Sequence, residues 1–174
     1  LFEEEDISIQ LFSDDEKIKE LAELQERADK ELFGRPSYRM ELGDVIGDGL
    51  LGNGFFSSKI GGFVVKHFDI GEKEGSKNRE LIESSPVTAV IEGEDSVRKW
   101  IRTGMLFERV FLMAERKGVS IHPMSQILEL EDAREELEET IGTGKKALHL
   151  FRIGLSGKKR KKTPRRNVEE FLTG

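Results

Sequence analysis

Residues 97–117, VRKWIRTGMLFERVFLMAERK, have the strongest helical pattern in the sequence. Apolar residues recur along it at helical spacing, and Phe107 and Phe111 widen the apolar stripe to more than half of the helix surface. Asp95 and Ser96 precede the stretch and provide N-cap chemistry, and Gly118 ends it. The pattern predicts a long helix that is central and buried.

Gly104 interrupts this helix near its middle. A glycine inside a helix costs about 1 kcal/mol relative to alanine, so another feature must offset that cost. The simplest one is the close approach of a second backbone. We therefore expect Gly104 and Glu108 to be packing and helix-contact residues rather than ligands.

Outward from this helix, short apolar strands alternate with further helices. Strands are expected at residues 6–12, 86–91, 119–122 and 147–154, and helices at 15–33, 36–46, 127–141 and, at the end, from 167. Residues 47–75 contain many glycines and are predicted to be a long connection with one strand at 62–67. This connection is either a functional lid or a surface excursion.

Composition limits the class of protein. The chain has 174 residues, a net charge of −6 and no cysteine, which excludes disulfides, thiolate metal sites and cysteine nucleophiles. No apolar run is long enough to cross a membrane, the absence of cysteine suits the cytoplasm, and the negative charge argues against general nucleic-acid binding. We expect a single domain over residues 1–174, truncated at its N-terminus, with a basic tail at 155–174.

A resemblance to a known family lies in the order of four motifs. They are WIRTGMLFERVFLMAERKG at 100–118, SIHP at 120–123, LFRIG at 150–154 and TPRRNVEE at 163–170. Together they resemble the C-terminal half of the FMN-dependent nitroreductase family, especially the divergent branch typified by the mycobacterial Acg proteins. Residues 6–28 also resemble the first core strand and the following helix of that family.

The resemblance implies an α+β fold, a nitroreductase-like mixed sandwich with a small, largely antiparallel central sheet packed by helices. It further implies a homodimer that binds FMN, accepts hydride from NAD(P)H and reduces a nitroaromatic, a quinone or a similar acceptor. Two family features have no counterpart in this sequence, namely an Arg-Ser-x-Arg segment and a Pro-Ser-x-x-Asn run. In addition, Pro123-Met124-Ser125-Gln126 stands where the family has Pro-x-Glu-Gly.

The resemblance also implies cofactor-binding residues. By its place before the terminal helix, Arg165 corresponds to the arginine that contacts the FMN phosphate, with Arg166 and Lys162 as near alternatives; a guanidinium can hold a phosphate through two parallel hydrogen bonds. The residues beside the flavin ring would be Met124, Ser125 and Gln126. Other interpretations stay open. The basic run at residues 158–166 is a solvated loop or a nucleic-acid patch, and residues 124–126 form an ordinary turn.

No catalytic side chain and no metal site are predicted. His67, His122 and His149 do not have metal-ligand spacing. A bound flavin would carry out the redox chemistry, so the protein needs to supply only orientation and electrostatics. Two alternatives to an enzyme remain: a non-catalytic flavin-binding, storage or interaction protein of the same fold, and a nucleic-acid-associated protein that uses the basic tail.

Overall fold

The computed structural model describes residues 7–49 and 55–156, and divides them into two compact units. The first unit contains residues up to 32 and from 71 onward, and the second contains residues from 33 to 70. Arg165, Arg166, Lys162 and the helix expected from residue 167 lie outside the described residues. Each unit is described separately below.

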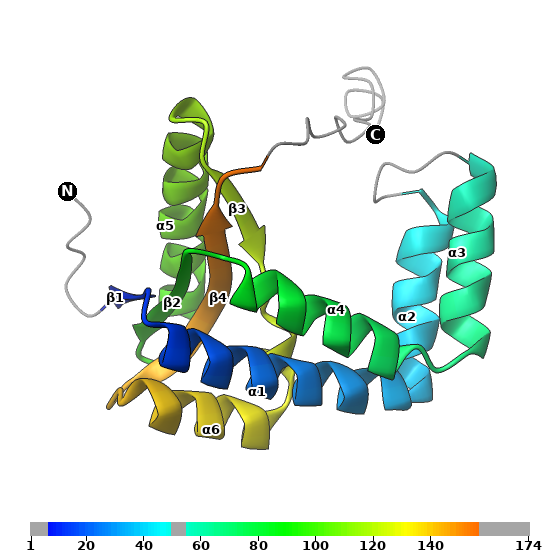
Figure 1. The fold of residues 1–174 in the computed structure, drawn as a ribbon, viewed down its shortest axis with the longest axis horizontal. Coiled ribbons are helices and arrows are strands. Elements are labelled where there is room, and N and C mark those ends of the chain that lie inside the picture. The colour runs from blue at the N-terminus through cyan, green and yellow to red at the C-terminus, as the bar shows by residue number, and fades with distance from the viewer. Residues whose placement is uncertain (1–6, 50–54, 157–174) are drawn as a thin grey trace. The chain divides into compact units, whose positions relative to one another are not determined.

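The first unit is built on an antiparallel sheet with the strand order β1-β2-β4-β3 (Figure 1). Its strands are β1 (Ile7–Phe12), β2 (Val87–Gly93), β3 (Ser120–Pro123) and β4 (Lys146–Gly154). The sequence predicted all four strands to within about two residues at each end. β2 and β4 form the centre, with Ala89 opposite Phe151 and Val90 opposite Leu150.

One face of this sheet is covered by helix α5 (Val97–Arg116). Because side chains alternate along a strand, Ala89, Ile91 and Phe151 point toward α5 and pack with Leu106 in one apolar cluster. Phe107, Val110 and Phe111 pack against that cluster at its margin. The long helix that the sequence predicted is therefore present and fixes one layer of the fold.

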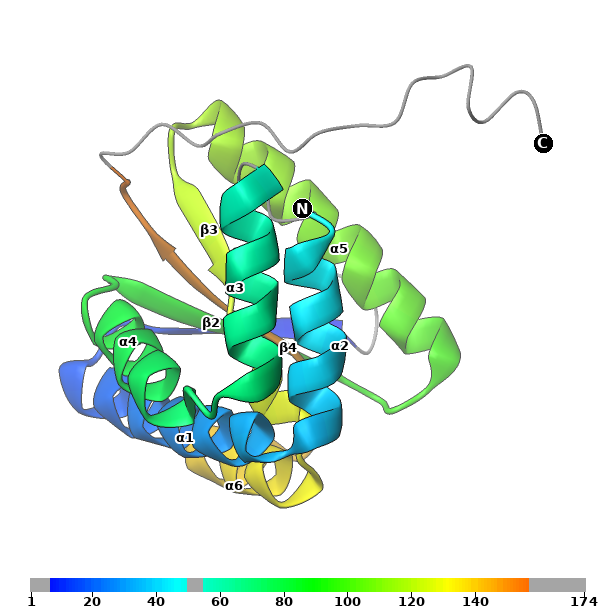
Figure 2. The same cartoon turned by 90° about the vertical axis from the view of Figure 1, so that its right-hand side faces the viewer.

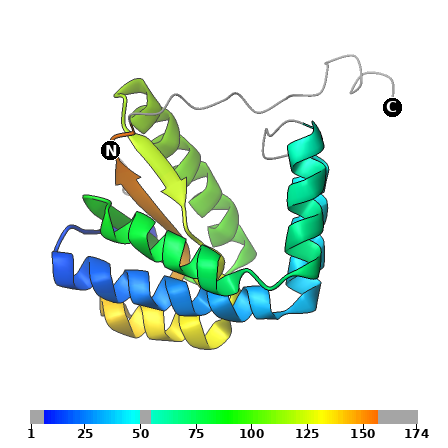
Figure 3. The same cartoon turned by 45° about the vertical axis from the view of Figure 1, so that its right-hand side comes forward.

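The opposite face of the sheet is covered by α1 (Asp15–Gly34), α4 (Gly71–Glu83) and α6 (Glu131–Ile141), as Figures 1 and 3 show. The Asp14 side chain caps α1, since its Oδ1 accepts from the amides of Glu16 and Lys17, both at 3.1 Å. Gly142 ends α6 in the left-handed conformation with φ of 67°. The expected helix at 127–141 is split into a 3₁₀ turn, η1 (Gln126–Glu129), and α6.

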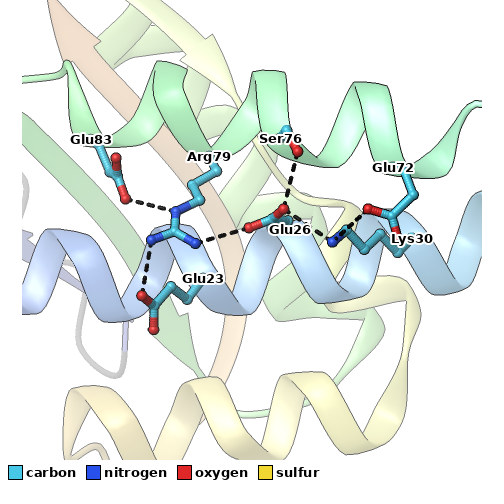
Figure 4. A network of polar contacts seen from close by, with 7 residues as sticks. All are labelled: Glu23, Glu26, Lys30, Glu72, Ser76, Arg79 and Glu83. Carbon is cyan, nitrogen blue, oxygen red and sulfur yellow. Dashed lines mark hydrogen bonds and ion pairs between the residues drawn. The ribbon is translucent and has the colours of Figure 1, made fainter.

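Ion pairs join α1 to α4 (Figure 4). Arg79 donates to three carboxylates, with distances of 2.8 Å to Glu83, 3.1 Å to Glu26 and 3.0 Å to Glu23. Burial opposes ionisation of Glu26, but hydrogen bonds from Lys30, Arg79 and Ser76 outweigh that effect and lower its pKa. The network is completed by a bond from Lys30 Nζ to Glu72 at 2.8 Å.

The second unit contains a pair of helices, α2 (Pro36–Gly47) and α3 (Phe55–His67), which lie side by side in Figure 2. The prediction of a long connection at 47–75 with a strand at 62–67 is wrong, because α3 and α4 occupy most of it. Gly62 serves helix contact instead of a turn, whereas Gly49 has a φ of 75° and lies in a turn. A Cβ on Gly62 would lie 2.5 Å from the carbonyl oxygen of Gly43, so only glycine permits this approach.

Gly75 plays a similar part in the first unit. A Cβ built there would lie 2.9 Å from the carbonyl oxygen of Glu26, so α4 contacts the backbone of α1 directly. Gly62 and Gly75 are thus explained by close helix packing, although glycines in a single sequence usually indicate a loop.

Candidate functional site

The turn after β3 contains the three residues that the sequence placed beside a flavin ring. The Met124 side chain is fully buried in the core, and its backbone amide donates to the carbonyl oxygen of Leu150 at 2.9 Å. This contact continues the pairing of β3 with β4 by one residue. Met124 therefore contributes to the core through its side chain and cannot offer that side chain to a ligand.

Ser125 connects the turn to β4 through its hydroxyl. Its Oγ lies 2.7 Å from His149 Nδ1 and 3.1 Å from the Leu150 carbonyl oxygen, and it accepts from the Leu150 amide at 3.3 Å. Three short contacts to adjacent residues of one strand hold the hydroxyl in one place. The Ser125 side chain is directed into the protein.

His149 lies against α5 on the face of the sheet that α5 covers. Its ring centroid is 4.3 Å from that of Phe107, at an angle of 75°, and 5.6 Å from that of Phe151. Burial lowers the pKa of His149 to about 4, so the imidazole is neutral at pH 7. Its Nε2 atom is buried and has no hydrogen-bond partner among the described residues.

Gln126 connects the other end of the turn to α1. Its Oε1 accepts from Gln25 Nε2 at 3.3 Å, and the same Gln25 nitrogen donates to Asp29 Oδ1 at 3.0 Å. Asn78 Nδ2 donates to the second oxygen of Asp29 at 2.8 Å. Burial raises the pKa of the Asp29 carboxyl, and the hydrogen bonds from Asn78 and Gln25 offset only part of that effect.

The structure therefore brings Met124, Ser125 and Gln126 together, and the turn they form is held by β4 on one side and by α1 on the other. All three side chains are directed inward. Any contact from this turn to a bound ligand would therefore come from its main chain.

Helix α5 differs from the expectation of a central, buried helix, because one side of it is exposed. Trp100 is 53% exposed, Ile101 61% and Met105 50%, because the sheet covers only one side of the helix. A Cβ on Gly104 would meet nothing within 4 Å, so the backbone approach expected there is not made among the described residues. The Trp100 indole is nevertheless held in place, since its N–H donates to Asp95 Oδ1 at 2.7 Å.

Open hollows occur elsewhere on the first unit, in the groove between α1 and α6. Leu24, Arg27 and Glu136 line both of its adjoining parts. The remaining lining residues are mostly charged; they are Lys17, Glu20, Glu23, Ala28, Glu31, Leu130, Asp132, Ala133, Glu139 and Thr140. A flavin ring needs a mostly apolar slot, so this groove does not fit FMN.

Within residues 7–49 and 55–156, no three histidine or carboxylate side chains gather as metal ligands, and none of the helices has the length and apolar character of a membrane span. His122 accepts from Arg152 Nε at 3.3 Å on the edge of the sheet. His67 lies on α3 in the second unit, stacked on Phe63 with ring centroids 4.2 Å apart.

Sequence reasoning missed His149, Gln25 and Asp29. His149 was interpreted as one of three isolated histidines, and its link to Ser125 spans 24 residues. Gln25 and Asp29 lie one helical turn apart on the buried side of α1, between apolar residues. A buried polar pair at spacing i, i+4 was the one available signal.

Comparison with known proteins gives the fold. No family model matches the chain, and no curated protein matches it. Among solved structures, it is similar to the FMN and NADPH-dependent nitroreductase NfnB from sphigopyxis sp. strain HMH, with 14% identity, 95% of this chain and 78% of that chain covered, and a TM-score of 0.58.

A second similar structure is a BluB-like flavoprotein from Clostridium difficile 630, with 13% identity, 95% of this chain and 78% of that chain covered, and a TM-score of 0.53. The α+β fold with a small antiparallel sheet matches these nitroreductase-type neighbours, which confirms the predicted fold class.

Proposed function

We propose that the chain is an FMN-dependent NAD(P)H oxidoreductase of the nitroreductase type, which reduces nitroaromatic, quinone or similar acceptors. The observation that carries this proposal is the match of 95% of the chain to the fold of NfnB, a nitroreductase described as dependent on FMN and NADPH. The Pro-Arg-Arg segment at 164–166 supports the divergent, Acg-like branch. The absence of cysteine supports a cytoplasmic location.

In this proposal the turn at residues 124–126 lies along the edge of the flavin ring. Its main chain is held on both sides, which suits hydrogen bonding to a planar heterocycle. Arg165, with Arg166 and Lys162 near it in sequence, would hold the phosphate. FMN would supply the chemistry of electron transfer when bound, and the chain's own residues would bind and orient it.

A homodimer completes the proposal. The outward side of α5 exposes large apolar side chains: Val97, Trp100, Ile101, Met105, Leu112 and Met113. Exposed apolar surface of this extent on a rigid helix is typical of a protein interface. The indole of Trp100, fixed by Asp95, suits the anchor of such an interface because little side-chain freedom is lost on association.

The alternative is a non-catalytic protein of the same fold that binds or stores flavin, or acts through interactions. One specific observation favours it: Ser125 and Gln126 stand where the family's Pro-x-Glu-Gly pattern has Glu and Gly, and their side chains are bonded inside the protein.

Absorbance spectroscopy separates these functions. We expect the purified protein to be yellow, to lose its flavin absorbance on anaerobic addition of NADPH or NADH, and to regain it when a nitroaromatic or quinone is added. Flavin absorbance that neither nucleotide bleaches would select the non-catalytic alternative. A colourless protein that also fails to bind added FMN would refute the oxidoreductase and the flavin-binding or storage protein, and would leave only the interaction protein of the same fold.

A further inference from the structure

We propose that His149 is a positioning residue, which acts through Ser125 to hold the backbone of residues 124–126 in the geometry that binds the flavin edge. This inference rests on the proposed function and adds a residue that the family resemblance did not supply. His149 does not touch the ring in this proposal, and its effect is transmitted by one hydrogen bond.

The first argument is the arrangement of hydrogen bonds around Ser125. Its hydroxyl has a single proton but three close partners, which are His149 Nδ1 and both backbone groups of Leu150. If the hydroxyl donates to the Leu150 carbonyl, Nδ1 must donate to Oγ; otherwise Oγ donates to Nδ1. The first arrangement needs a proton on Nδ1 and the second needs Nδ1 to be unprotonated, and both join the turn to β4.

The second argument is the rigidity of His149 itself. Phe107 of α5 packs edge-on against the ring, and Phe151 flanks it along the strand. Such packing restricts the rotation of the imidazole, so a hydrogen bond from it restricts Ser125 more than a bond from a mobile surface side chain would.

The third argument is that the opposite end of the turn is also fixed. Gln126 is bonded to Gln25, which is fully buried and is itself bonded to Asp29. With both flanking side chains engaged, the position of the main chain between them depends on these two links. Loss of one link leaves the turn free to shift, and shifts of about 1 Å are enough to weaken a positioned contact.

A double-mutant cycle with FMN tests this inference. His149→Phe keeps an aromatic ring but removes Nδ1, and Ser125→Ala removes the hydroxyl. We expect each change to raise the FMN dissociation constant about tenfold, measured by quenching of flavin fluorescence. The double variant should bind FMN no more weakly than Ser125→Ala alone, because the bond that His149→Phe removes is already absent once the hydroxyl is gone.

Two further variants separate positioning from stability. His149→Asn places an amide near the position of Nδ1, and we expect it to restore most of the FMN affinity. Ser85→Ala is the matched control: the Ser85 hydroxyl is also buried, donates to the Leu81 carbonyl at 2.7 Å and accepts from Arg152. It should lower stability while changing the FMN dissociation constant less than twofold.

The midpoint potential of the bound flavin gives a second readout. We expect His149→Phe and Ser125→Ala to shift it in the same direction, and Ser85→Ala to leave it unchanged. If all variants lose stability but none changes the affinity or the potential, or if the two losses of affinity multiply, His149 is only structural and the inference is wrong while the proposed function stands.

A measurement on the unaltered protein covers the case in which His149→Phe does not fold. On saturation with FMN, the amide signals of Ser125 and Gln126 and the ring nitrogens of His149 should shift in NMR spectra. No shift at these atoms with FMN bound overturns the inference. Failure of the unaltered protein to bind FMN at all overturns the proposed function, and the inference with it.

Discussion

The two faces of the sheet are both buried, but the layers that cover them differ on the side facing away from the sheet. Helix α5 presents Trp100, Ile101 and Met105 there, all half exposed or more. On the other face, α1 and α4 present charged side chains joined by ion pairs around Arg79 (Figure 4). The α1, α4 and α6 layer is complete within one chain, whereas α5 has an apolar surface that a second molecule can bury.

The interiors of the two layers also differ. Under α5 the contacts are mostly apolar and aromatic, and the polar side chains buried there include His149, Lys99 and Thr103. Under α1 the interior contains the hydrogen-bonded set of Gln25, Asp29 and Asn78. Burial of polar groups is tolerated when they are hydrogen-bonded, so each layer is stable for a different physical reason.

The largest expected effect concerns the exposed side of α5. Combining Ile101→Glu and Met105→Glu should convert a homodimer into a monomer, with a dissociation constant at least a thousandfold higher (about 4 kcal/mol), because two carboxylates would be buried without partners. Light scattering after size exclusion measures the mass. Lys19→Glu, on an exposed position of α1, makes the same change in net charge and should leave the mass unchanged.

The next effect concerns acid stability of the α5 side. The pKa of His149 is lowered from 6.5 to about 4 by burial, so the folded state binds this proton less tightly than the unfolded state. This lowered pKa contributes to the free energy of unfolding above about pH 6.5. The contribution, roughly 3 kcal/mol at most, is lost as the pH falls toward 4.

The measurement is urea unfolding at several pH values between 7 and 4. His149→Phe should remove this part of the acid loss, so that the difference in stability between the two proteins changes steadily over that range. A difference that stays constant with pH would contradict the account of a buried neutral histidine.

A smaller effect contrasts a glycine in each layer. Gly75→Ala should lower the free energy of unfolding by about 2 kcal/mol, because its Cβ would meet the Glu26 carbonyl. Gly104→Ala should raise it by about 1 kcal/mol through helix propensity, when both changes are made in the monomeric Ile101→Glu, Met105→Glu background. Thermal or urea unfolding measures both; changes of the same sign would contradict the difference in packing.

The smallest effect tests the ion pairs of the α1 and α4 layer. Arg79→Met should lower the midpoint of urea unfolding slightly, since Glu23, Glu26 and Glu83 would lose a shared cation, and added salt should reduce the loss. Arg27→Met breaks a single exposed pair with Glu136 and serves as the comparison. An equally large loss for Arg27→Met would mean that the network adds nothing beyond separate pairs.

The sequence predicted the four strands and the helices α1, α2, α5 and α6, because each has an apolar periodicity that one segment carries within itself. The prediction was wrong for α3 and α4. In these helices Gly62 and Gly75 are needed for contact with the neighbouring helices α2 and α1, and that need depends on a partner distant in sequence. The turn at 124–126 was located correctly, but not the inward direction of its side chains.

The spacing of neighbouring residues was enough to predict the local elements other than α3 and α4 and the apolar character of α5, and composition alone excludes thiol chemistry. Three features follow only from tertiary packing: the hydrogen bond between Ser125 and His149, the hydrogen bond between Gln126 and Gln25, and the burial of α5 on one side only. Such pairings depend on how strands and helices far apart in the chain pack together. Local periodicity predicts which side of a helix or strand is apolar, but not which residues that side will contact.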